Sequence, residues 1–266
     1  MLATATRLHT VLTQPRCTLG VFVPAGVHHP DIQCRQLDRL AQAGADLFEI
    51  GLPCANAALD GRLIRSAYHR ALVKGEVIDR TVRAVAHAAS LRPTVVMTYW
   101  EPVLRHGPEH LARLFAEAGA AGMMVVDLPR DETLRWHRAA RAAGLSAPHL
   151  VPRTTADADL RTAVNGASGW LYAPASTGPT GYRGPLDLPA LDAFAQRLRA
   201  ASQLPVVSGV GISSPALAAH VAPLVDAVVI GTPVVRALLS DPAPAAAVTA
   251  EFAHALRTGI GTAPDA

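Results

Sequence analysis

The sequence predicts a single (β/α)₈ barrel. Eight short apolar runs recur along the 266 residues, and stretches rich in alanine, arginine and leucine, with apolar residues at helical spacing, separate them. Several of these helical stretches end on a glycine before the next apolar run, as at Gly44, Gly119 and Gly144. Eight strand–helix units in about 250 residues have the size of such a barrel.

Each apolar run is short enough for a buried strand of a parallel sheet. The expected strands cover residues 21–23, 47–52, 94–99, 123–128, 149–152, 170–172, 205–208 and 227–230. A doubly wound open sheet is the alternative fold, but it usually has fewer strands and a Gly-x-Gly-x-x-Gly turn after the first one. Residues 23–26 do not form that turn. We therefore expect the barrel.

No linker, charge block or low-complexity segment divides the chain, so residues 1–266 are expected to form one domain. An N-terminal helix or extension is expected over about residues 1–16, and a flexible C-terminal tail over about residues 256–266. The apolar runs are shorter than the roughly 20 residues of a membrane span, and the first residues lack the apolar core of a secretory signal. We expect a cytoplasmic enzyme without a membrane partner.

Composition excludes several other classes of function. Cys17, Cys34 and Cys54 are unevenly spaced and include no Cys-x-x-Cys pair, which favours reduced thiols over a disulfide framework or a zinc site. The net charge of +3 comes from arginines scattered along the predicted helices, and scattered charge is typical of a solvated face. No nucleic-acid partner is therefore expected.

Two carboxylates in an apolar setting are the strongest indication of chemistry. Glu49 lies within the expected strand 47–52, and Asp60 follows eleven residues later. A glutamate buried in such a strand must be solvated by a cavity or have its pKa raised, and either outcome suits an acid/base catalyst. The structural alternative is that a buried arginine pairs with Glu49 and that Asp60 only begins a helix.

Other side chains stand where expected strands end, which is the catalytic end of a barrel. Phe22 and Tyr99 are candidates for contact with an apolar or aromatic substrate, and Tyr172 ends the sixth expected strand. Each of these aromatic residues could equally belong to the core or rim. Asp127 is a candidate substrate-binding residue, with capping of the following turn as its alternative role.

The last loops indicate a phosphate site. Residues 176–181, 208–213 and 230–234 are rich in glycine and follow the sixth, seventh and eighth expected strands. Glycines allow close approach of the backbone to an anion, and a helix N-terminus offers free N–H groups. Barrel enzymes commonly bind phosphate at this position.

Two common aldolase designs are not favoured. Lys74 is the only lysine, and it falls at the end of a predicted helix rather than inside the barrel, where a Schiff base would form. The eleven histidines are dispersed, so no metal centre is expected. What remains is carbon–carbon or carbon–oxygen chemistry driven by proton transfer, with the substrate as its own electron sink and without a cofactor.

The chain resembles the tryptophan synthase α subunit family from about Val21 to Leu238. The motifs that carry the resemblance are residues 22–26, 44–53, 59–61, 97–100, 126–129, 178–181, 209–212 and 230–232. The resemblance implies a (β/α)₈ barrel that cleaves indole-3-glycerol phosphate to indole and glyceraldehyde 3-phosphate, without a metal or cofactor.

The resemblance also implies a role for each matching residue. Glu49 takes the place of the acid/base glutamate, Asp60 that of the aspartate binding the indole N–H, and Tyr172 that of the tyrosine near the glutamate. Thr180 matches the threonine of a mobile loop that closes over the substrate. The phosphate-binding backbone positions fall on Gly181, Gly211, Gly231 and Thr232.

The chain departs from the family where the α subunit contacts or supports its β subunit. Residues 53–57 lack an acidic residue and a proline of the family pattern, and Tyr99 is followed by Trp100 and Glu101. Separately, Arg62 replaces a proline, a change expected to alter the dynamics of the loop. The hypothesis is a lyase that releases indole by itself. The alternatives are a divergent α subunit that depends on a β subunit, and a retired barrel that serves as a binding or scaffold subunit.

Overall fold

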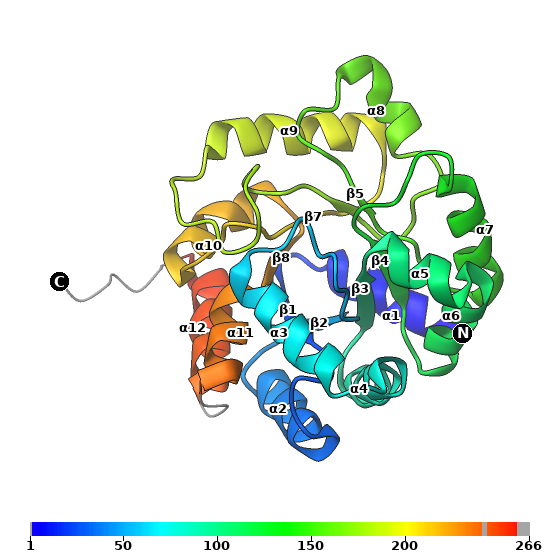
Figure 1. Ribbon diagram of the computed structural model, residues 1–266. Helices are drawn as coiled ribbons and strands as arrows, with labels where there is room; N and C mark the ends of the chain where they lie inside the picture. Colours follow the sequence, from blue (N-terminus) through cyan, green and yellow to red (C-terminus); the bar gives the residue numbers. More distant parts are fainter. Residues whose placement is uncertain (1, 241–243, 260–266) are drawn as a thin grey trace.

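Parallel strands form the centre of the molecule, and helices surround them (Figure 1). The computed structural model describes residues 2–240 and 244–259, and within them eight strands lie in the order β4-β3-β2-β1-β8-β7-β6-β5. The strands are β1 (Thr18–Pro24), β2 (Leu47–Gly51), β3 (Thr94–Thr98), β4 (Gly122–Val125), β5 (His149–Leu150), β6 (Leu171–Tyr172), β7 (Val206–Ser208) and β8 (Ala227–Ile230).

The sheet closes on itself between β4 and the segment before β5. Gly122 forms a parallel bridge with Ser146, and the Met123 N–H donates to the Ser146 carbonyl at 2.9 Å. Every apolar run of the sequence overlaps one of the strands, although β5 and β6 are only two residues long. The predicted (β/α)₈ barrel is thereby confirmed.

The helices follow the strands in the order that the sequence pattern predicts. They are α1 (Leu2–Leu12), α2 (Pro30–Gln42), α3 (Arg62–Val73), α4 (Val77–Leu91), α5 (Trp100–His106), α6 (Pro108–Glu117), α7 (Thr133–Ala143), α8 (Asp157–Ala163), α9 (Leu188–Ala201), α10 (Pro215–Val221), the 3₁₀ turn η1 (Ala222–Leu224), α11 (Thr232–Ser240) and α12 (Pro244–Thr258). No helix of the described residues is both long and apolar enough to cross a membrane.

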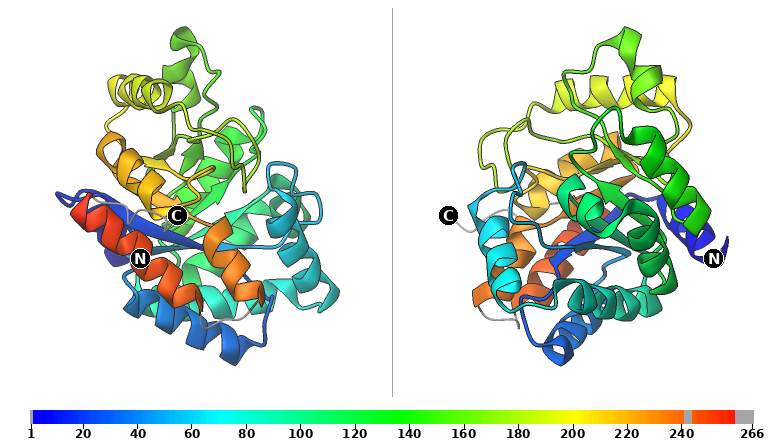
Figure 2. Two further views of the ribbon diagram at one scale, coloured as in Figure 1. Left: turned by 90° about the vertical axis from the view of Figure 1, so that its left-hand side faces the viewer. Right: turned by 45° about the vertical axis from the view of Figure 1, so that its right-hand side comes forward.

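The last helix packs against elements from both ends of the chain. In Figures 1 and 2, α12 lies beside α2, which it contacts, and also against α10 and α11. The flexible tail expected from about residue 256 stays a prediction. The helix α12 continues to Thr258 because Phe252, Ala255 and Leu256 are buried. Residues 260–266 lie outside the described part of the chain.

Strand β2 shows how the barrel sorts its side chains. Successive strand residues point to opposite faces. Phe48 and Ile50 belong to the apolar cluster between strands and helices, whereas Leu47 belongs to the cluster inside the barrel. Glu49 shares the face of Leu47, so the alternation directs its carboxylate into the barrel interior.

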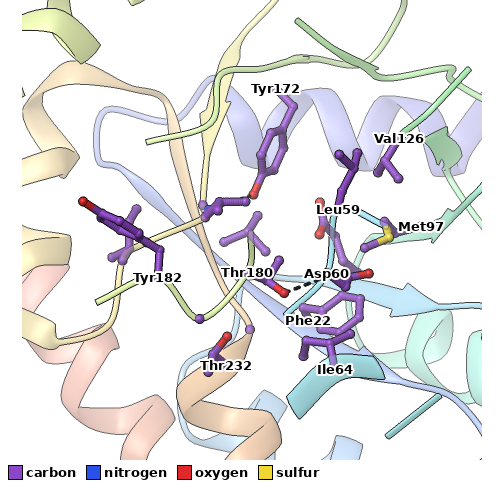
Figure 3. Close-up of a pocket in the computed structure, with 18 of the residues that line it drawn as sticks. Phe22, Leu59, Asp60, Ile64, Met97, Val126, Tyr172, Thr180, Tyr182 and Thr232 are labelled. Carbon is purple, nitrogen blue, oxygen red and sulfur yellow. Dashed lines mark hydrogen bonds between the residues drawn. The ribbon is translucent and has the colours of Figure 1, made fainter. Parts of the chain in front are cut away.

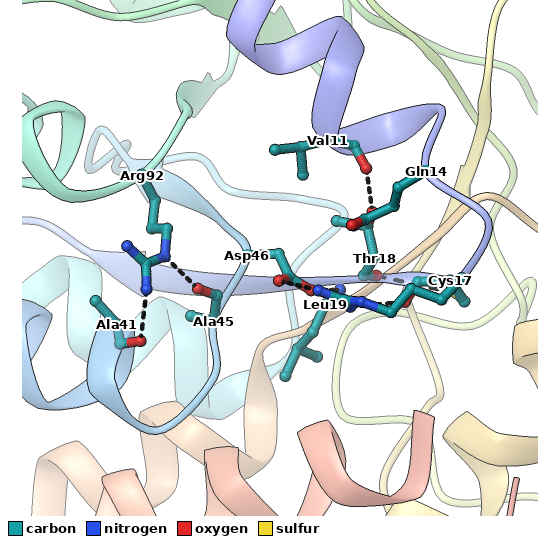
Figure 4. A network of polar contacts seen from close by, with 10 residues as sticks. Val11, Gln14, Cys17, Thr18, Leu19, Ala41, Ala45, Asp46 and Arg92 are labelled. Atoms are coloured by element: carbon teal, nitrogen blue, oxygen red, sulfur yellow. Dashed lines mark hydrogen bonds and ion pairs between the residues drawn. The ribbon is translucent and has the colours of Figure 1, made fainter. Parts of the chain in front are cut away.

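Polar contacts hold the strands in place at their amino-terminal end. The Asp46 carboxylate accepts from the Leu19 N–H at 2.9 Å and forms two bonds with the Arg16 guanidinium (Figure 4). The Thr18 hydroxyl donates to the Val11 carbonyl of α1 at 2.6 Å, and Arg92 donates to backbone carbonyls before β2. In barrels this end serves stability, and the loops of the opposite end carry function.

Candidate active site

A cavity of about 460 Å³ opens at the carboxyl ends of the strands (Figure 3). Its lining residues come from the strands, from the loops after β2, β6, β7 and β8, and from the helices α3 and α11. Its apolar wall consists of Phe22, Ile64, Met97, Met124, Val126, Leu150 and Val229. Glu49 and Asp60 are the carboxylates in the lining.

Glu49 is a buried carboxyl group without a compensating partner. Its side chain lines the cavity, and its Oε1 has no hydrogen-bond partner among the described residues. Burial raises the pKa of Glu49 to about 8, and the nearby charge of Asp60 adds to the rise. The alternative of a buried arginine partner is therefore wrong. Near neutral pH this group holds a proton that it can donate, as acid/base catalysis requires.

Asp60 has a different environment although it lies in the same cavity. The Tyr99 hydroxyl donates to Asp60 Oδ2 at 2.8 Å, and the Thr180 hydroxyl donates to Oδ1 at 3.0 Å. Burial raises the pKa of Asp60, and these two hydrogen bonds oppose that rise. The side chain does not cap the helix α3. These two environments suit different roles. Glu49, without a hydrogen-bond partner at Oε1, suits a proton donor, and Asp60, which accepts two hydrogen bonds, suits an anion that stabilises positive charge.

The loop after β6 is closed onto the loop after β2. The Gly61 N–H donates to the Thr180 hydroxyl oxygen at 2.8 Å, and the Thr180 N–H donates to the Leu59 carbonyl at 3.3 Å. A Cβ at position 61 would lie 1.9 Å from the Thr180 carbonyl oxygen, so this approach requires glycine. Figure 3 shows the Thr180 side chain directed at Asp60, with the hydrogen bond between them as a dashed line.

Tyr172 lies beside Glu49 at the end of β6. Its hydroxyl oxygen accepts from the Val210 N–H at 3.3 Å. Burial raises the pKa of Tyr172, and the charge of Glu49 adds to this effect, so the hydroxyl stays neutral. A Cβ at Gly209 would lie 1.8 Å from the tyrosine oxygen. The glycine-rich loop after β7 therefore positions this hydroxyl, a role that its sequence did not indicate.

The cavity also brings the glycine-rich turns together. Gly181, Gly211, Gly231 and Thr232 all line the cavity, although they come from the loops after three different strands. The helix α11 begins at Thr232, with Pro233 in its first turn. The first N–H groups of a helix lack partners within it, and its dipole favours an anion there. These features suit a phosphate group.

The structure places the predicted residue Asp127 away from the cavity lining. Asp127 lies in the turn after β4, and its Oδ1 accepts from the Trp100 N–H at 2.6 Å, which holds the start of α5. Trp100 packs in the cluster between strands and helices, not in the cavity. The predicted substrate contact of Asp127 stays a prediction, and its observed contact is structural. Phe22 and Tyr99 do line the cavity, as does Thr180.

The cavity also contains residues that sequence patterns did not single out. Met97, Met124 and Val126 look like ordinary strand residues in the sequence, and only barrel closure shows which of them face inward. No group of three or more His, Cys, Asp or Glu side chains in the described part of the chain could hold a metal ion.

Comparison with known proteins places this geometry in a family. Residues 8–259 match the family model described as tryptophan synthase alpha chain. The tryptophan synthase alpha chain of Streptomyces avermitilis is 36% identical over 252 residues, which cover 92% of this chain and 91% of the relative. That of Streptomyces coelicolor is 35% identical and covers 92% and 93%.

Solved structures agree with the sequence comparison. The tryptophan synthase of Mycobacterium tuberculosis superposes with a TM-score of 0.85 at 32% identity and covers 96% of this chain and 98% of that one. The tryptophan synthase subunit alpha of Legionella pneumophila gives a TM-score of 0.82 at 27% identity, with the same coverage. This chain therefore belongs to the tryptophan synthase α chain family of tryptophan biosynthesis and is a carbon–carbon lyase for indole-3-glycerol phosphate.

Proposed function

We propose that Glu49 and Asp60 carry out the cleavage of indole-3-glycerol phosphate, and that the chain releases indole without a partner subunit. The observation that carries the catalytic proposal is the pair of buried carboxyl groups in one cavity. Glu49 lacks a partner at Oε1, whereas Asp60 accepts two hydrogen bonds. The glycine-rich turns line the same cavity.

The first step is protonation of the substrate. Protonated Glu49 donates to the indole carbon that bears the glycerol phosphate chain, and the ring nitrogen becomes positively charged. Asp60 accepts the ring N–H and stabilises this charge as it develops. The carboxylate stays fixed because Tyr99 and Thr180 hold its two oxygens.

The second step breaks the carbon–carbon bond. The electron pair of this bond returns to the ring and restores its aromaticity, while the hydroxyl on the adjacent chain carbon becomes the aldehyde. Its proton passes to Glu49, which is ionised after the first step, and the enzyme returns to its starting state. The neutral Tyr172 hydroxyl lies near Glu49 and restricts the position of the substrate there. The balance of atoms needs neither a metal nor a redox cofactor.

The stand-alone proposal is supported by the closed loop. Contacts within this one chain hold Thr180 over Asp60, through the Gly61 N–H and the Leu59 carbonyl. A closed loop excludes water and completes the site. In the altered segment 53–57, Cys54 and Ala57 are buried and belong to the interior cluster. The segment therefore still packs against the barrel although it lacks the family's acidic residue.

The second candidate is an α subunit that depends on a β subunit, and a specific surface favours it. A groove of about 350 Å³ lies between the altered segment 53–57, the turn before α4 and the helix α5. Beside it, Val73 is 73% exposed and Leu104 is 54% exposed. Exposed apolar side chains beside a groove are typical of a protein interface.

Steady-state assays distinguish the two candidates. The purified chain is incubated with indole-3-glycerol phosphate, and indole is measured with and without a tryptophan synthase β subunit. The stand-alone proposal predicts substantial turnover alone and less than about a threefold rise on addition of the β subunit. A rise of about a hundredfold would establish the dependent subunit instead.

The third candidate, a retired barrel acting as a binding or scaffold subunit, makes a different prediction. In such a protein, a Glu49→Gln variant would release as much indole as the original protein does. The buried, partnerless position of Glu49 argues against it, because an ionisable group without a function is costly to retain there. We also propose a cytoplasmic location, which detection of the tagged protein in cell fractions would test.

A further inference from the structure

Two arginines lie at the phosphate end of the cavity. Arg183 follows Gly181 by two residues in the loop after β6, and Arg236 lies on α11 four residues after Thr232. Both side chains line the same cavity as the glycine-rich turns, and both residues are exposed to solvent. They come from separate elements and meet only in the folded barrel.

The position of Arg236 follows from helix geometry. Residues four apart lie on the same face of a helix, so Arg236 shares the face of Thr232. Side chains on a helix lean toward its N-terminus. The guanidinium of Arg236 is thereby directed back toward the first turn of α11, where N–H groups and the helix dipole favour an anion.

Neither guanidinium has an ion-pair partner within the described residues. Arg16, by contrast, pairs with Asp46, and Arg199 pairs with Asp226. The carboxylates that share the cavity with the two free arginines are Glu49 and Asp60, and both of these are buried. Two free cations at the mouth of a cavity with an acidic interior leave charge available for an anionic ligand.

This distribution of charge also orients a substrate. A phosphate group would be repelled by the interior carboxylates when they are ionised and attracted by the arginines at the mouth. The uncharged ring would then enter first and reach Asp60. A guanidinium can donate two parallel hydrogen bonds to a phosphate and carries a full positive charge, which backbone N–H groups lack.

We propose that Arg183 and Arg236 bind the substrate phosphate together with the glycine-rich turns. The proposal rests on the proposed cleavage of indole-3-glycerol phosphate and adds two binding residues to it. Because the phosphate does not change during the reaction, these contacts are equally strong in ground and transition states. They therefore lower KM and leave kcat unchanged.

The test uses Arg183→Gln, Arg236→Gln and the double variant in the full chain. Each single variant is expected to raise KM about tenfold, as loss of a charge-assisted hydrogen bond does, with kcat within about twofold. The exposed Arg113 of α6 lies outside the cavity, and Arg113→Gln removes the same charge as a matched control. Its KM should stay at the wild-type value.

Binding of inorganic phosphate, measured by calorimetry, keeps the inference separate from catalysis. The double variant should bind phosphate at least tenfold more weakly than wild type and Arg113→Gln, and its affinity should depend less on salt. An unchanged KM and unchanged phosphate affinity in the double variant would overturn the inference. If the wild-type chain released no indole, the proposed function would fail, and the phosphate titration would still decide the role of the arginines.

Discussion

The buried position of Glu49 should make protein stability depend on pH in a way that its substitution removes. Burial and the charge of Asp60 raise the pKa of Glu49 to about 8 in the folded protein, from an ordinary value of 4.5. Between pH 4.5 and about pH 8, Glu49 therefore keeps its proton in the folded state and has lost it in the unfolded state. Stability from this group is full below pH 4.5 and is lost as the pH rises through about 8.

The magnitude follows from the two pKa values. At about 1.4 kcal/mol for each pH unit, ionisation of Glu49 in its buried position removes about 4 kcal/mol of stability between pH 5 and pH 8. In a Glu49→Gln variant this loss is absent, because the amide does not ionise. For a protein of this size, about 4 kcal/mol corresponds to a change in Tm of roughly 10 °C.

Thermal unfolding followed by circular dichroism measures this difference. We expect the Tm of Glu49→Gln, relative to wild type, to rise by roughly 10 °C from about pH 5 to about pH 8. The contributions of most other titrating groups cancel in the comparison, since both proteins share them. A Tm difference that stays constant over this pH range would refute the buried, unpaired state of Glu49.

Three further predictions test the closed loop and the histidines. Thr180→Val removes the donor to Asp60 and should lower kcat/KM by about 10- to 100-fold, whereas Thr180→Ser should retain most activity in the same assay. Gly61→Ala places a Cβ 1.9 Å from the Thr180 carbonyl oxygen and should open the loop. We expect kcat/KM to fall at least about tenfold while the Tm stays within about 3 °C of wild type. Wild-type kinetics in this variant would show that the loop contact is not needed. Burial lowers the pKa of His149 to about 4, and His137 adds to the effect, so stability should fall as the pH drops from about 6.5 toward 4. His149→Gln should flatten the plot of Tm against pH in this range, and an unchanged plot would contradict the buried neutral state.

The sequence predicted the barrel and the catalytic end because these features follow from local patterns. Alternation within β2 places Glu49 opposite Phe48 and Ile50, and this alternation is visible in five residues. The glycine-rich turns were likewise predicted to meet, since the ends of parallel strands lie at one edge of a sheet. Both predictions needed only strand period and strand direction.

Contacts between distant segments could not be predicted in this way. The hydrogen bond from the Val210 N–H to Tyr172 and that from the Trp100 N–H to Asp127 depend on the register of neighbouring loops, which residue spacing does not specify. The inward position of Met97 depends on barrel closure, and the continuation of α12 depends on burial of Leu256. Each of these results from tertiary packing.

The measurement that tests the central claim most directly is indole release by the purified chain alone, compared with its Glu49→Gln variant. We predict that wild type converts indole-3-glycerol phosphate to equal amounts of indole and glyceraldehyde 3-phosphate. We predict that Glu49→Gln, although folded, loses at least about 1,000-fold in kcat because an amide cannot donate and take back the proton as the carboxyl group does. A folded Glu49→Gln protein with wild-type turnover would contradict the assignment of Glu49 as the acid/base catalyst.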